Sequence, residues 1–277
     1  MSKTIACIVT YNPDITLLQN NVEALINEVD KVVIIDNYSK NKDLIIESSK
    51  NWGAVFVGLS ENFGIAYALN VGLDYAVSNG GDLLLTMDQD SYFNPGGVSI
   101  LKKSMESDSE KTAIMSPLMY DVTSGFKENI KSSSQVVRTV ITSGALCRVP
   151  LLTEVGGWDD KLFIDGVDFD LCYRLRLRGY KLKKLKYVEL NHCLGNSQKR
   201  RLIANFLVTN HSSTRVYYQF RNKVYLIRKY YHAFPTEMLR LLLSSIKKFL
   251  SILLFETDIK LKIRKSFVGV IDGLKLK

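Results

Sequence analysis

Two aspartates separated by one residue give the first indication of chemistry. Asp88 and Asp90 follow an apolar run at residues 83–87 that is typical of a buried strand. Alternation along an extended chain would place both carboxylates on one side. Such a pair ionises at low cost only when water or a cation screens it, and Mg²⁺ or Mn²⁺ suits carboxylates that share it with substrate phosphates. The pair predicts a divalent-metal site; the alternative is an acidic turn closing the strand, with Asp90 beginning a helix near Pro95.

A second acidic centre lies at residues 163–170, Phe-Ile-Asp-Gly-Val-Asp-Phe-Asp, and a helical pattern follows it up to Gly179. Asp168 would therefore lie near a helix amino terminus, where the helix dipole favours an ionised carboxylate. Two interpretations stay open at this point. Asp168 could carry chemistry, or it could serve as a helix cap, which is a common use of aspartate at that position.

The elements that must position these residues alternate regularly. Apolar runs at residues 4–9, 31–35, 54–57 and 83–87 are separated by helical patterns at about 14–29, 41–51 and 65–77. This order is typical of an α/β protein with a parallel sheet covered on both faces. Ligands gather at the carboxyl ends of such strands, which here carry Thr10, Asp36 and Asp88. No G-x-G-x-x-G follows the first strand, so a dinucleotide-binding Rossmann domain is disfavoured.

The middle of the chain is less regular. We expect a short helix beyond Pro95, a strand at 113–117 and a surface loop at 121–135. A further strand at 136–141 should run into the segment Thr-Ser-Gly-Ala-Leu-Cys-Arg at 142–148.

Basic charge is confined to the last part of the chain. Residues 1–214 carry 23 Lys and Arg against 24 Asp and Glu, whereas residues 215–277 carry 14 against 4. From residue 236 onward apolar residues keep helical spacing with basic residues between them. We therefore predict two parts, a catalytic domain at 1–214 and a basic amphipathic helical tail at 215–277. Such helices lie on anionic membranes, so we expect the tail to bind a membrane surface. The alternatives are that the tail forms a homodimer contact or packs against the rest of the chain.

Four cysteines, Cys7, Cys147, Cys172 and Cys193, lie far apart and match no zinc or redox spacing. Their apolar neighbours indicate buried thiols in a reducing compartment. The apolar part of the amino terminus is too short for a signal peptide, and no stretch approaches the length of a bilayer span. We therefore expect a cytoplasmic protein that is peripheral at the inner face of the cell membrane.

The order of motifs along the chain resembles that of family 2 glycosyltransferases. The motifs are Thr10-Tyr11-Asn12, Asp36-Asn37, Asn62-Phe63-Gly64, Asn70-Val71-Gly72, Asp88-Gln89-Asp90, Ser143-Gly144-Ala145, Gly157-Trp158-Asp159 and Val167-Asp168-Phe169-Asp170. The resemblance covers about residues 3–225, and the segment 163–168 looks most like bacterial rhamnosyltransferases of that family. It implies a GT-A fold, which is a Rossmann-like nucleotide-binding mixed sheet flanked by helices, with a C-terminal helical appendage. The nucleotide-sugar half would span about 1–92 and the acceptor half about 93–214.

The resemblance also implies roles for individual residues. The nucleotide sugar would be bound by Thr10, Tyr11, Asn12, Asp36, Asn62, Gly64, Asn70, Asp88 and Gln89. The metal, Mg²⁺ or Mn²⁺, would be bound by Asp88, Asp90 and His192. Alternatively, His192 could be a structural histidine at a strand end whose ring nitrogens form hydrogen bonds within the protein. Asp168 would be the general base. The acceptor would meet Trp158, Asp159 and Asp165, although the indole of Trp158 could equally be structural.

The implied activity is a metal-dependent, inverting transfer of one sugar. The resemblance points to L-rhamnose from dTDP-rhamnose, moved to a lipid-linked or oligosaccharide acceptor in the synthesis of O-antigen, capsule or rhamnan. Val167 stands where many family members have glutamate, which supports the rhamnosyl subgroup. The Gln-x-x-Arg-Trp signature of processive synthases is absent, because Trp52 and Trp158 are the only tryptophans.

Three alternatives remain beside this interpretation. The same fold could use a UDP-hexose donor. A nucleotidyltransferase is disfavoured because no glycine-rich, lysine-bearing loop follows the first strand. A non-catalytic protein that binds nucleic acid through its basic tail would show steep salt dependence; the near-neutral residues 1–214 and the two acidic centres disfavour it, so we expect no nucleic-acid partner.

Overall fold

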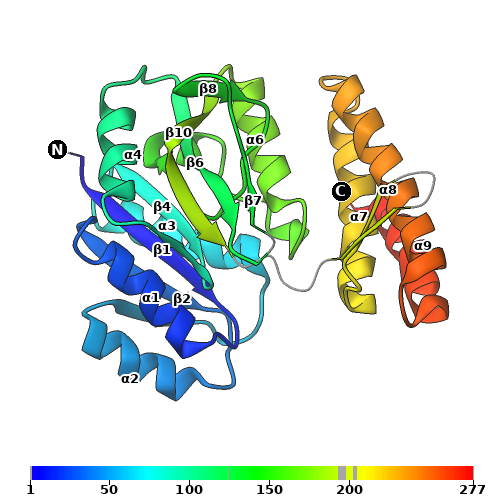
Figure 1. Ribbon diagram of the computed structural model, residues 1–277, viewed down its shortest axis with the longest axis horizontal. Helices are drawn as coiled ribbons and strands as arrows, with labels where there is room; N and C mark the ends of the chain where they lie inside the picture. The colour runs from blue at the N-terminus through cyan, green and yellow to red at the C-terminus, as the bar shows by residue number, and fades with distance from the viewer. Residues whose placement is uncertain (1, 124, 193–197, 202–204, 277) are drawn as a thin grey trace. The chain divides into compact units, whose positions relative to one another are not determined.

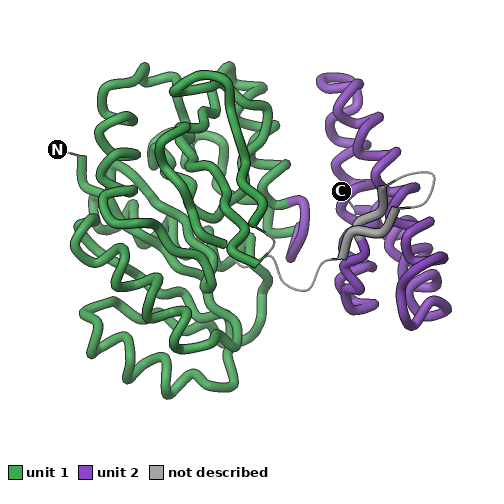
Figure 2. Tube along the Cα trace, in the orientation of Figure 1, with its two compact units in different colours: residues 1–161, 167–193 green, residues 162–166, 194–277 purple. Residues whose placement is uncertain are grey.

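The computed structural model describes residues 2–123, 125–192, 198–201 and 205–276 (Figure 1). The chain divides into two compact units, which Figure 2 colours separately. The first unit comprises Met1–Lys161 and Val167–Cys193, and the second comprises Leu162–Gly166 and Leu194–Lys277. The boundary predicted after residue 214 lies within the second unit. Cys193, one of the four predicted buried thiols, lies outside the described residues, whereas Cys7, Cys147 and Cys172 are free and buried.

One mixed sheet organises the first unit. Its order is β3-β2-β1-β4-β9-β6-β10-β5, with β7 beside β6 and β8 beside β10. The first four strands of this path are parallel, as the alternating pattern predicts, and β9 then pairs antiparallel with both β4 and β6. The strands are β1 Thr4–Thr10, β2 Lys31–Asp36, β3 Val55–Gly58, β4 Leu83–Asp88, β5 Ser91–Phe93, β6 Thr112–Asp121, β7 Phe126–Lys127, β8 Ser134–Val137, β9 Ala145–Arg148 and β10 Lys181–His192.

Helices cover both faces of this sheet (Figure 1). On one face, apolar residues of α1, α2 and α4 form a single core with alternate residues of the parallel strands, among them Ala6, Ile8 and Ile34. On the other face α3 contacts β1, β2 and β4. The helices of the first unit are α1 Ile15–Leu25, α2 Lys42–Trp52, α3 Ile65–Ser78, α4 Gly97–Glu106, α5 Val149–Glu154 and α6 Val167–Leu177, with a 3₁₀ turn, η1, at Asp160–Leu162.

The structure corrects the prediction for residues 113–141. Strand β6 continues to Asp121, the predicted surface loop contains β7 and the first half of the short strand β8, and β8 ends at Val137 rather than near 141. Strand β8 pairs antiparallel with β10 and its residues are exposed or half-buried. Backbone pairing with β10 therefore holds this strand, and pairing of that kind leaves little apolar signal in a sequence.

The second unit is mainly helical. It contains α7 Ser213–Tyr230, α8 Pro235–Phe255 and α9 Ile259–Lys275, with a two-stranded antiparallel sheet of β11 Gln198–Arg201 and β12 Asn205–Val208. Helix α7 packs against both other helices, and Val216, Phe220 and Ile252 form a small core. The described helices include none with both the length and the apolar content required to cross a bilayer.

The segment Leu162–Gly166 joins this helical unit through one buried side chain. The Asn222 amide on α7 donates to the carbonyl oxygens of Ile164 and Asp165, both at 2.7 Å. Leu226 lies 3.1 Å from where a Cβ on Gly166 would stand, and Gly166 has φ +86°. A side chain at Gly166 would thus be strained and crowded.

Candidate functional site

Asp88, Asp90 and His192 form a cluster able to bind a metal. Asp88 ends β4, Gln89 and Asp90 form a turn, and His192 ends β10. One ligand atom from each residue lies within 4.8 Å of the others, and all three side chains are half-buried. The turn, and not alternation along an extended strand, brings the carboxylates together. The alternative of a helix beginning at Asp90 is wrong, because β5 follows at Ser91 and α4 begins only at Gly97.

Neighbouring polar groups fix this cluster. The Asn21 side chain donates to the Asp88 carbonyl oxygen at 2.7 Å. The Tyr11 backbone N–H donates to Gln89 Oε1 at 2.8 Å, which ties the turn to the end of β1. Ser91 Oγ lies 2.6 Å from His192 Nδ1, and that ring nitrogen is 3.8 Å from Asp90 Oδ1. Partners of this kind orient metal ligands in many proteins, so the geometry fits both a ligand and a histidine held at a strand end.

The donor set fits a divalent cation. Two carboxylates supply the hard oxygens that Mg²⁺ and Mn²⁺ prefer.

Adjacent residues in one loop hold the two acidic centres. Ser143 Oγ accepts a hydrogen bond from the Asp88 backbone N–H at 3.1 Å. The Thr142 hydroxyl donates to Asp168 Oδ1. Asp168 is in the first turn of α6, as predicted, where the helix dipole favours its ionised form. Two residues that are far apart in sequence, Asp88 through its backbone N–H and Asp168 through its carboxylate, are therefore held by one dipeptide.

The loop that carries this dipeptide is fastened to β4. The Thr86 hydroxyl donates to the Thr142 carbonyl oxygen at 2.6 Å, and the Gly144 N–H donates to the Thr86 carbonyl oxygen at 2.8 Å. Gly144 has φ +75°, and a Cβ there would come within 2.9 Å of both Leu190 and Pro117. Glycine is therefore required both by the backbone conformation and by the close packing.

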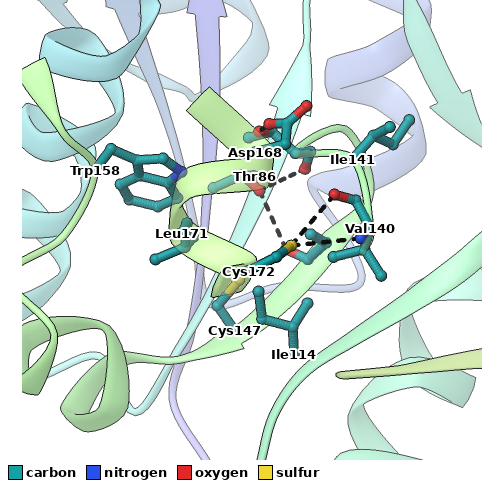
Figure 3. A pocket seen from close by; sticks show the side chains of 11 residues that line it. Thr86, Ile114, Val140, Ile141, Cys147, Trp158, Asp168, Leu171 and Cys172 are labelled. Carbon is teal, nitrogen blue, oxygen red and sulfur yellow. Dashed lines mark hydrogen bonds between the residues drawn. The ribbon is translucent and has the colours of Figure 1, made fainter. Parts of the chain in front are cut away.

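A small pocket, partly open to solvent, lies beside Asp168 (Figure 3). Thr86, Thr142 and Asp168 supply its polar lining. The other lining residues are Ile114, Val140, Ile141, Ala145, Cys147, Trp158, Leu171 and Cys172. Burial raises the pKa of the Cys172 thiol to about 12; it is therefore protonated at neutral pH and is a poor nucleophile. The chemistry available at this cavity thus belongs to Asp168.

Trp158 lines this cavity and is only 3% exposed. Within the described part of the chain its indole Nε1 is buried and has no hydrogen-bond partner. Figure 3 shows the ring along one side of the cavity, with Asp168 and Thr86 nearby. Buried polar groups nearly always have a partner, so this N–H is suited to a hydroxyl group of a bound ligand.

Asn70 holds the loop that carries Trp158. Its amide nitrogen donates to the Trp158 carbonyl oxygen at 2.8 Å and to Asp160 Oδ1 at 2.6 Å, and its oxygen accepts from the Trp158 N–H at 2.7 Å. The Asn70 side chain therefore holds this loop, and the nucleotide-contacting role of Asn70 stays a prediction. Gly157, with φ +64°, allows the contact, since a Cβ there would lie 2.3 Å from Asn70 Oδ1.

Thr10 and Asp36, both predicted to contact a nucleotide, are wholly buried. The Thr10 hydroxyl donates to Asp36 Oδ1 at 2.8 Å, and Ser39 N–H donates to Asp36 Oδ2 at 2.9 Å. The carboxylate thus organises the loop after β2. Asn12, with φ +48°, joins the same loop, donating its N–H to Ser39 Oγ at 2.7 Å. Tyr11 and Asn12 are the exposed residues of this group.

The loop before α3 is organised by a pair of asparagines. Asn62 Oδ1 accepts from the Asn37 amide at 2.9 Å and from the Gly64 N–H at 3.0 Å. Gly64 has φ +88° and precedes the first residue of α3. The nucleotide roles of Thr10, Tyr11, Asn12, Asp36, Asn62 and Gly64 stay predictions, and the structure shows how the chain positions them.

Two residues predicted to meet an acceptor have other described partners. Asp159 Oδ1 accepts from the Lys161 N–H at 3.2 Å. Asp165, with φ +63°, belongs to the second unit, where Arg215 pairs with both of its carboxylate oxygens at 3.1 and 3.2 Å. Their roles toward an acceptor stay predictions.

Sequence reasoning missed the residues that hold the site rather than form it. Asn21, Ser91 and Thr142 were given no role, and Ser143 was only part of a recurring motif. Each is a small polar residue beside an apolar element, which is a common surface pattern. Of these residues, only Ser143 had a signal in the sequence, because it belongs to the motif at 143–145.

Solved structures with this arrangement are glycosyltransferases. GalNAc-T7 with UDP, GalNAc and Mn²⁺ superposes with a TM-score of 0.67 at 15% identity, over 86% of this chain and 50% of that chain. The mannosyltransferase PcManGT from Pyrobaculum calidifontis, in complex with GDP-Man and Mn²⁺, gives a TM-score of 0.61 at 14% identity, over 100% of this chain and 76% of that chain. The chain therefore has the GT-A fold predicted from its motifs.

The family follows from the sequence itself. The family model described as Glycosyl transferase family 2 matches residues 5–150, and the chain belongs to that family. A dTDP-rhamnosyl transferase, RfbF from Shigella flexneri, is 27% identical over 99% of this chain and 96% of its own length. Poly-beta-1,6-N-acetyl-D-glucosamine synthase from Staphylococcus aureus is 25% identical over 59% of this chain and 43% of its own length. The predicted rhamnosyltransferase-like membership of family 2 is confirmed.

Proposed function

We propose that the protein transfers one L-rhamnosyl group from dTDP-rhamnose to a lipid-linked or oligosaccharide acceptor in cell-surface polysaccharide synthesis. The similarity to the Shigella flexneri dTDP-rhamnosyl transferase, which extends over nearly the whole of both chains, supports the donor. The observation that carries the reaction is that neighbouring residues, Ser143 and Thr142, hold Asp88 of the metal cluster and Asp168.

In this proposal the end of β4 binds the donor diphosphate. Asp88, Asp90 and His192 would hold a divalent cation, which would neutralise the negative charge that develops on the departing nucleoside diphosphate. Asn21 and Ser143 fix the backbone of Asp88, and Ser91 fixes the His192 ring. The chain therefore supplies an ordered ligand set before substrate arrives, which lowers the entropic cost of assembly.

Asp168 is the proposed general base. An acceptor hydroxyl is a weak nucleophile, and a carboxylate that takes its proton during attack activates it. The acceptor oxygen forms a new bond to the anomeric carbon while the bond to the diphosphate oxygen breaks, and the proton moves to Asp168. Attack from the side opposite the leaving group inverts the anomeric carbon, and no covalent sugar–enzyme intermediate is needed.

Trp158 is proposed to orient a sugar. Its indole N–H is buried beside the same cavity as Asp168 and has no described protein acceptor. A hydroxyl of the donor or acceptor sugar would accept this hydrogen bond. The aromatic ring offers the apolar surface on which the nonpolar face of a sugar packs well.

A donor panel tests the proposal. The protein is mixed with dTDP-rhamnose, UDP-glucose or UDP-galactose and with Mg²⁺ or Mn²⁺, and release of free nucleoside diphosphate is measured with and without added glycan acceptors. We expect dTDP-rhamnose to be the preferred donor and chelation of the metal to abolish release. A UDP-hexose as the preferred donor would overturn the rhamnosyl assignment while leaving the glycosyltransferase class intact.

The Asp168→Asn variant tests the base separately. Loss of a general base lowers turnover by about 10²–10⁴-fold, whereas binding of dTDP should persist. Asp74→Asn, at an exposed carboxylate on α3, is the matched control and should keep full activity. Full turnover by the Asp168→Asn protein would remove Asp168 from this role.

A further inference from the structure

Helix α8 exposes a continuous row of large apolar side chains, which we name the α8 stripe. Each is at least 40% exposed. Its members are Leu239, Leu242, Leu243, Ile246, Leu250, Leu253 and Leu254. Scattered exposed leucines are ordinary on a protein surface, but contiguous apolar patches mark interaction sites.

The α8 stripe is distinct from the face of the helix that packs inside the second unit. Met238, Ser251 and Ile252 are the buried residues of α8. At about 100° of rotation per residue, the stripe occupies an arc of roughly 120° beside the packed face. Arg240 and Lys247 are exposed and lie next to one edge of this arc. The helix therefore has an inner apolar face, an outer apolar stripe and a basic border.

Helix α9 has an outer surface of similar chemistry. Its inward residues are Lys262, Ser266, Gly269 and Gly273. Phe267, Ile271 and Leu274 are at least half exposed on its outer side. Lys260, Arg264 and Lys275 are exposed on the same helix. Two consecutive helices of the second unit thus combine exposed apolar side chains with exposed cations.

Charge decides which partner suits this surface. Residues 215–277 carry a surplus of ten positive charges, from 14 Lys and Arg against 4 Asp and Glu. A second copy of the same surface would bring like charges together, which opposes association. An anionic lipid surface offers the opposite charge together with an apolar layer below it, and basic amphipathic helices bind there with the helix axis in the plane of the interface.

We propose that α8 and α9 form a docking surface for anionic lipid bilayers. The α8 stripe enters the boundary between headgroups and acyl chains, and Arg240, Lys247 and the exposed cations of α9 lie among the lipid phosphates. This inference goes beyond the proposed function and does not depend on the identity of the sugar. A docked enzyme would be well placed to act on an acceptor carried by a lipid.

Vesicle co-sedimentation of the full chain tests the inference. The vesicles are made either of phosphatidylcholine alone or of phosphatidylcholine with about one-third phosphatidylglycerol, as a source of anionic charge. We expect binding to the anionic vesicles, and weakening as salt shortens the Debye length. The double variant Leu243→Asp/Leu250→Asp should bind at least about tenfold more weakly, because two leucines can no longer enter the apolar layer.

Matched variants separate docking from general damage. Leu44→Asp/Leu177→Asp alters two exposed leucines of the first unit and should leave vesicle binding unchanged. Arg240→Glu/Arg264→Glu should reduce binding, whereas Lys40→Glu/Lys103→Glu, with the same change of charge in the first unit, should reduce it much less. Circular dichroism verifies the helix content of every variant, and donor hydrolysis without lipid verifies the catalytic unit.

Three results would overturn the proposal. One is binding to anionic vesicles that the α8 stripe variant leaves intact. Another is absence of binding by the native chain to either vesicle. The third is a native dimer, seen by light scattering after gel filtration, that the α8 stripe variant converts to a monomer while neither protein binds lipid; that result would assign the stripe to a second copy.

Discussion

The Thr142 hydroxyl is the described donor to the proposed base, Asp168. This hydrogen bond helps to hold the carboxylate in one orientation. Thr142 is therefore a positioning residue, and the effect of changing it should differ from the effect of removing Asp168.

We predict that Thr142→Val lowers kcat by about tenfold, the equivalent of one hydrogen bond. KM for the nucleotide sugar should stay nearly constant, because the change is on the Asp168 side of the dipeptide. Thr142→Ser keeps the hydroxyl and should restore most of the turnover. Steady-state kinetics of the two variants check this, and an equal loss in both would show that the hydroxyl alone does not account for the role of Thr142.

Trp158 leads to a second prediction at this scale. Trp158→Phe keeps an aromatic ring but removes the buried N–H that has no described acceptor. If a sugar hydroxyl accepts from it, kcat/KM should fall by about tenfold. Thermal unfolding should change little, because no internal hydrogen bond is lost. A large fall in the unfolding temperature with unchanged kcat/KM would instead make the indole a purely structural residue.

At the scale of elements, helix α3 packs unusually close to β1. A Cβ on Gly72 would lie 2.3 Å from Cys7 Sγ. Burial raises the pKa of the Cys7 thiol to about 12, which is consistent with a neutral packing group. The close approach brings the start of α3, with its Asn62–Gly64 loop, against the edge of the sheet where β1 and β2 end.

We predict that Gly72→Ala lowers the free energy of unfolding of the first unit by about 1–3 kcal/mol through overpacking. Cys7→Ala removes the sulfur that causes the clash, so the double variant should recover much of the loss. Urea denaturation followed by tryptophan fluorescence measures this, since both tryptophans lie in the first unit. Additive losses in the double variant would contradict the contact.

The elements themselves were largely predictable. Each parallel strand is a continuous apolar run and each covering helix has helical spacing, because both follow from burial against one core. Only the last two residues of β8 lie within the predicted strand, since a strand held by backbone pairing with β10 leaves little apolar pattern. The strand predicted at 113–117 is shorter than β6, which continues to Asp121 beside β10. The turn at Gln89–Asp90 was also missed; its hydrogen bond to Tyr11 joins residues 78 positions apart, which local spacing does not encode.

The residues that meet in the metal cluster were easier to predict from the sequence than the contacts that hold the residues around it. Asp88, Asp90 and His192 meet as the motifs imply. The contacts that Asn70 makes with the Trp158 loop were not predicted, because they join residues 88 positions apart in the sequence. Only the tertiary arrangement distinguishes an amide that faces a ligand from one that closes a loop.

At the scale of the whole molecule, the second unit depends on a buried ionic group. Glu256 has no exposed side-chain surface, and its carboxylate accepts from Lys248 Nζ at 2.5 Å and from Lys262 Nζ at 2.9 Å. Burial alone would raise the pKa of Glu256, but the hydrogen bonds and charges of the two lysines outweigh it and lower the pKa below its ordinary value. Because the folded-state pKa is lowered, the stabilisation is present above the unfolded pKa and is lost as pH falls through the folded one.

We therefore predict that Glu256→Gln destabilises the second unit by about 3 kcal/mol at neutral pH, since two lysines lose their buried counter-charge. The difference from the native protein should shrink as pH falls from the ordinary glutamate pKa of about 4.3 through the lower folded-state pKa, where the native carboxyl becomes protonated too. Urea unfolding followed by far-ultraviolet circular dichroism at both pH values checks this. Tryptophan fluorescence, reporting on the first unit, should not respond.

The dipeptide Thr142–Ser143 has a consequence for how such an enzyme can change. In the proposed reaction, one peptide unit separates the contact to Asp168, which would take the acceptor proton, from the contact to Asp88, beside which the donor diphosphate would bind. Substitutions around either end can alter the choice of sugar without disturbing that span. A residue inserted between Thr142 and Ser143 would lengthen this spacing. The protein could then still bind both substrates but would lose the transfer of the sugar.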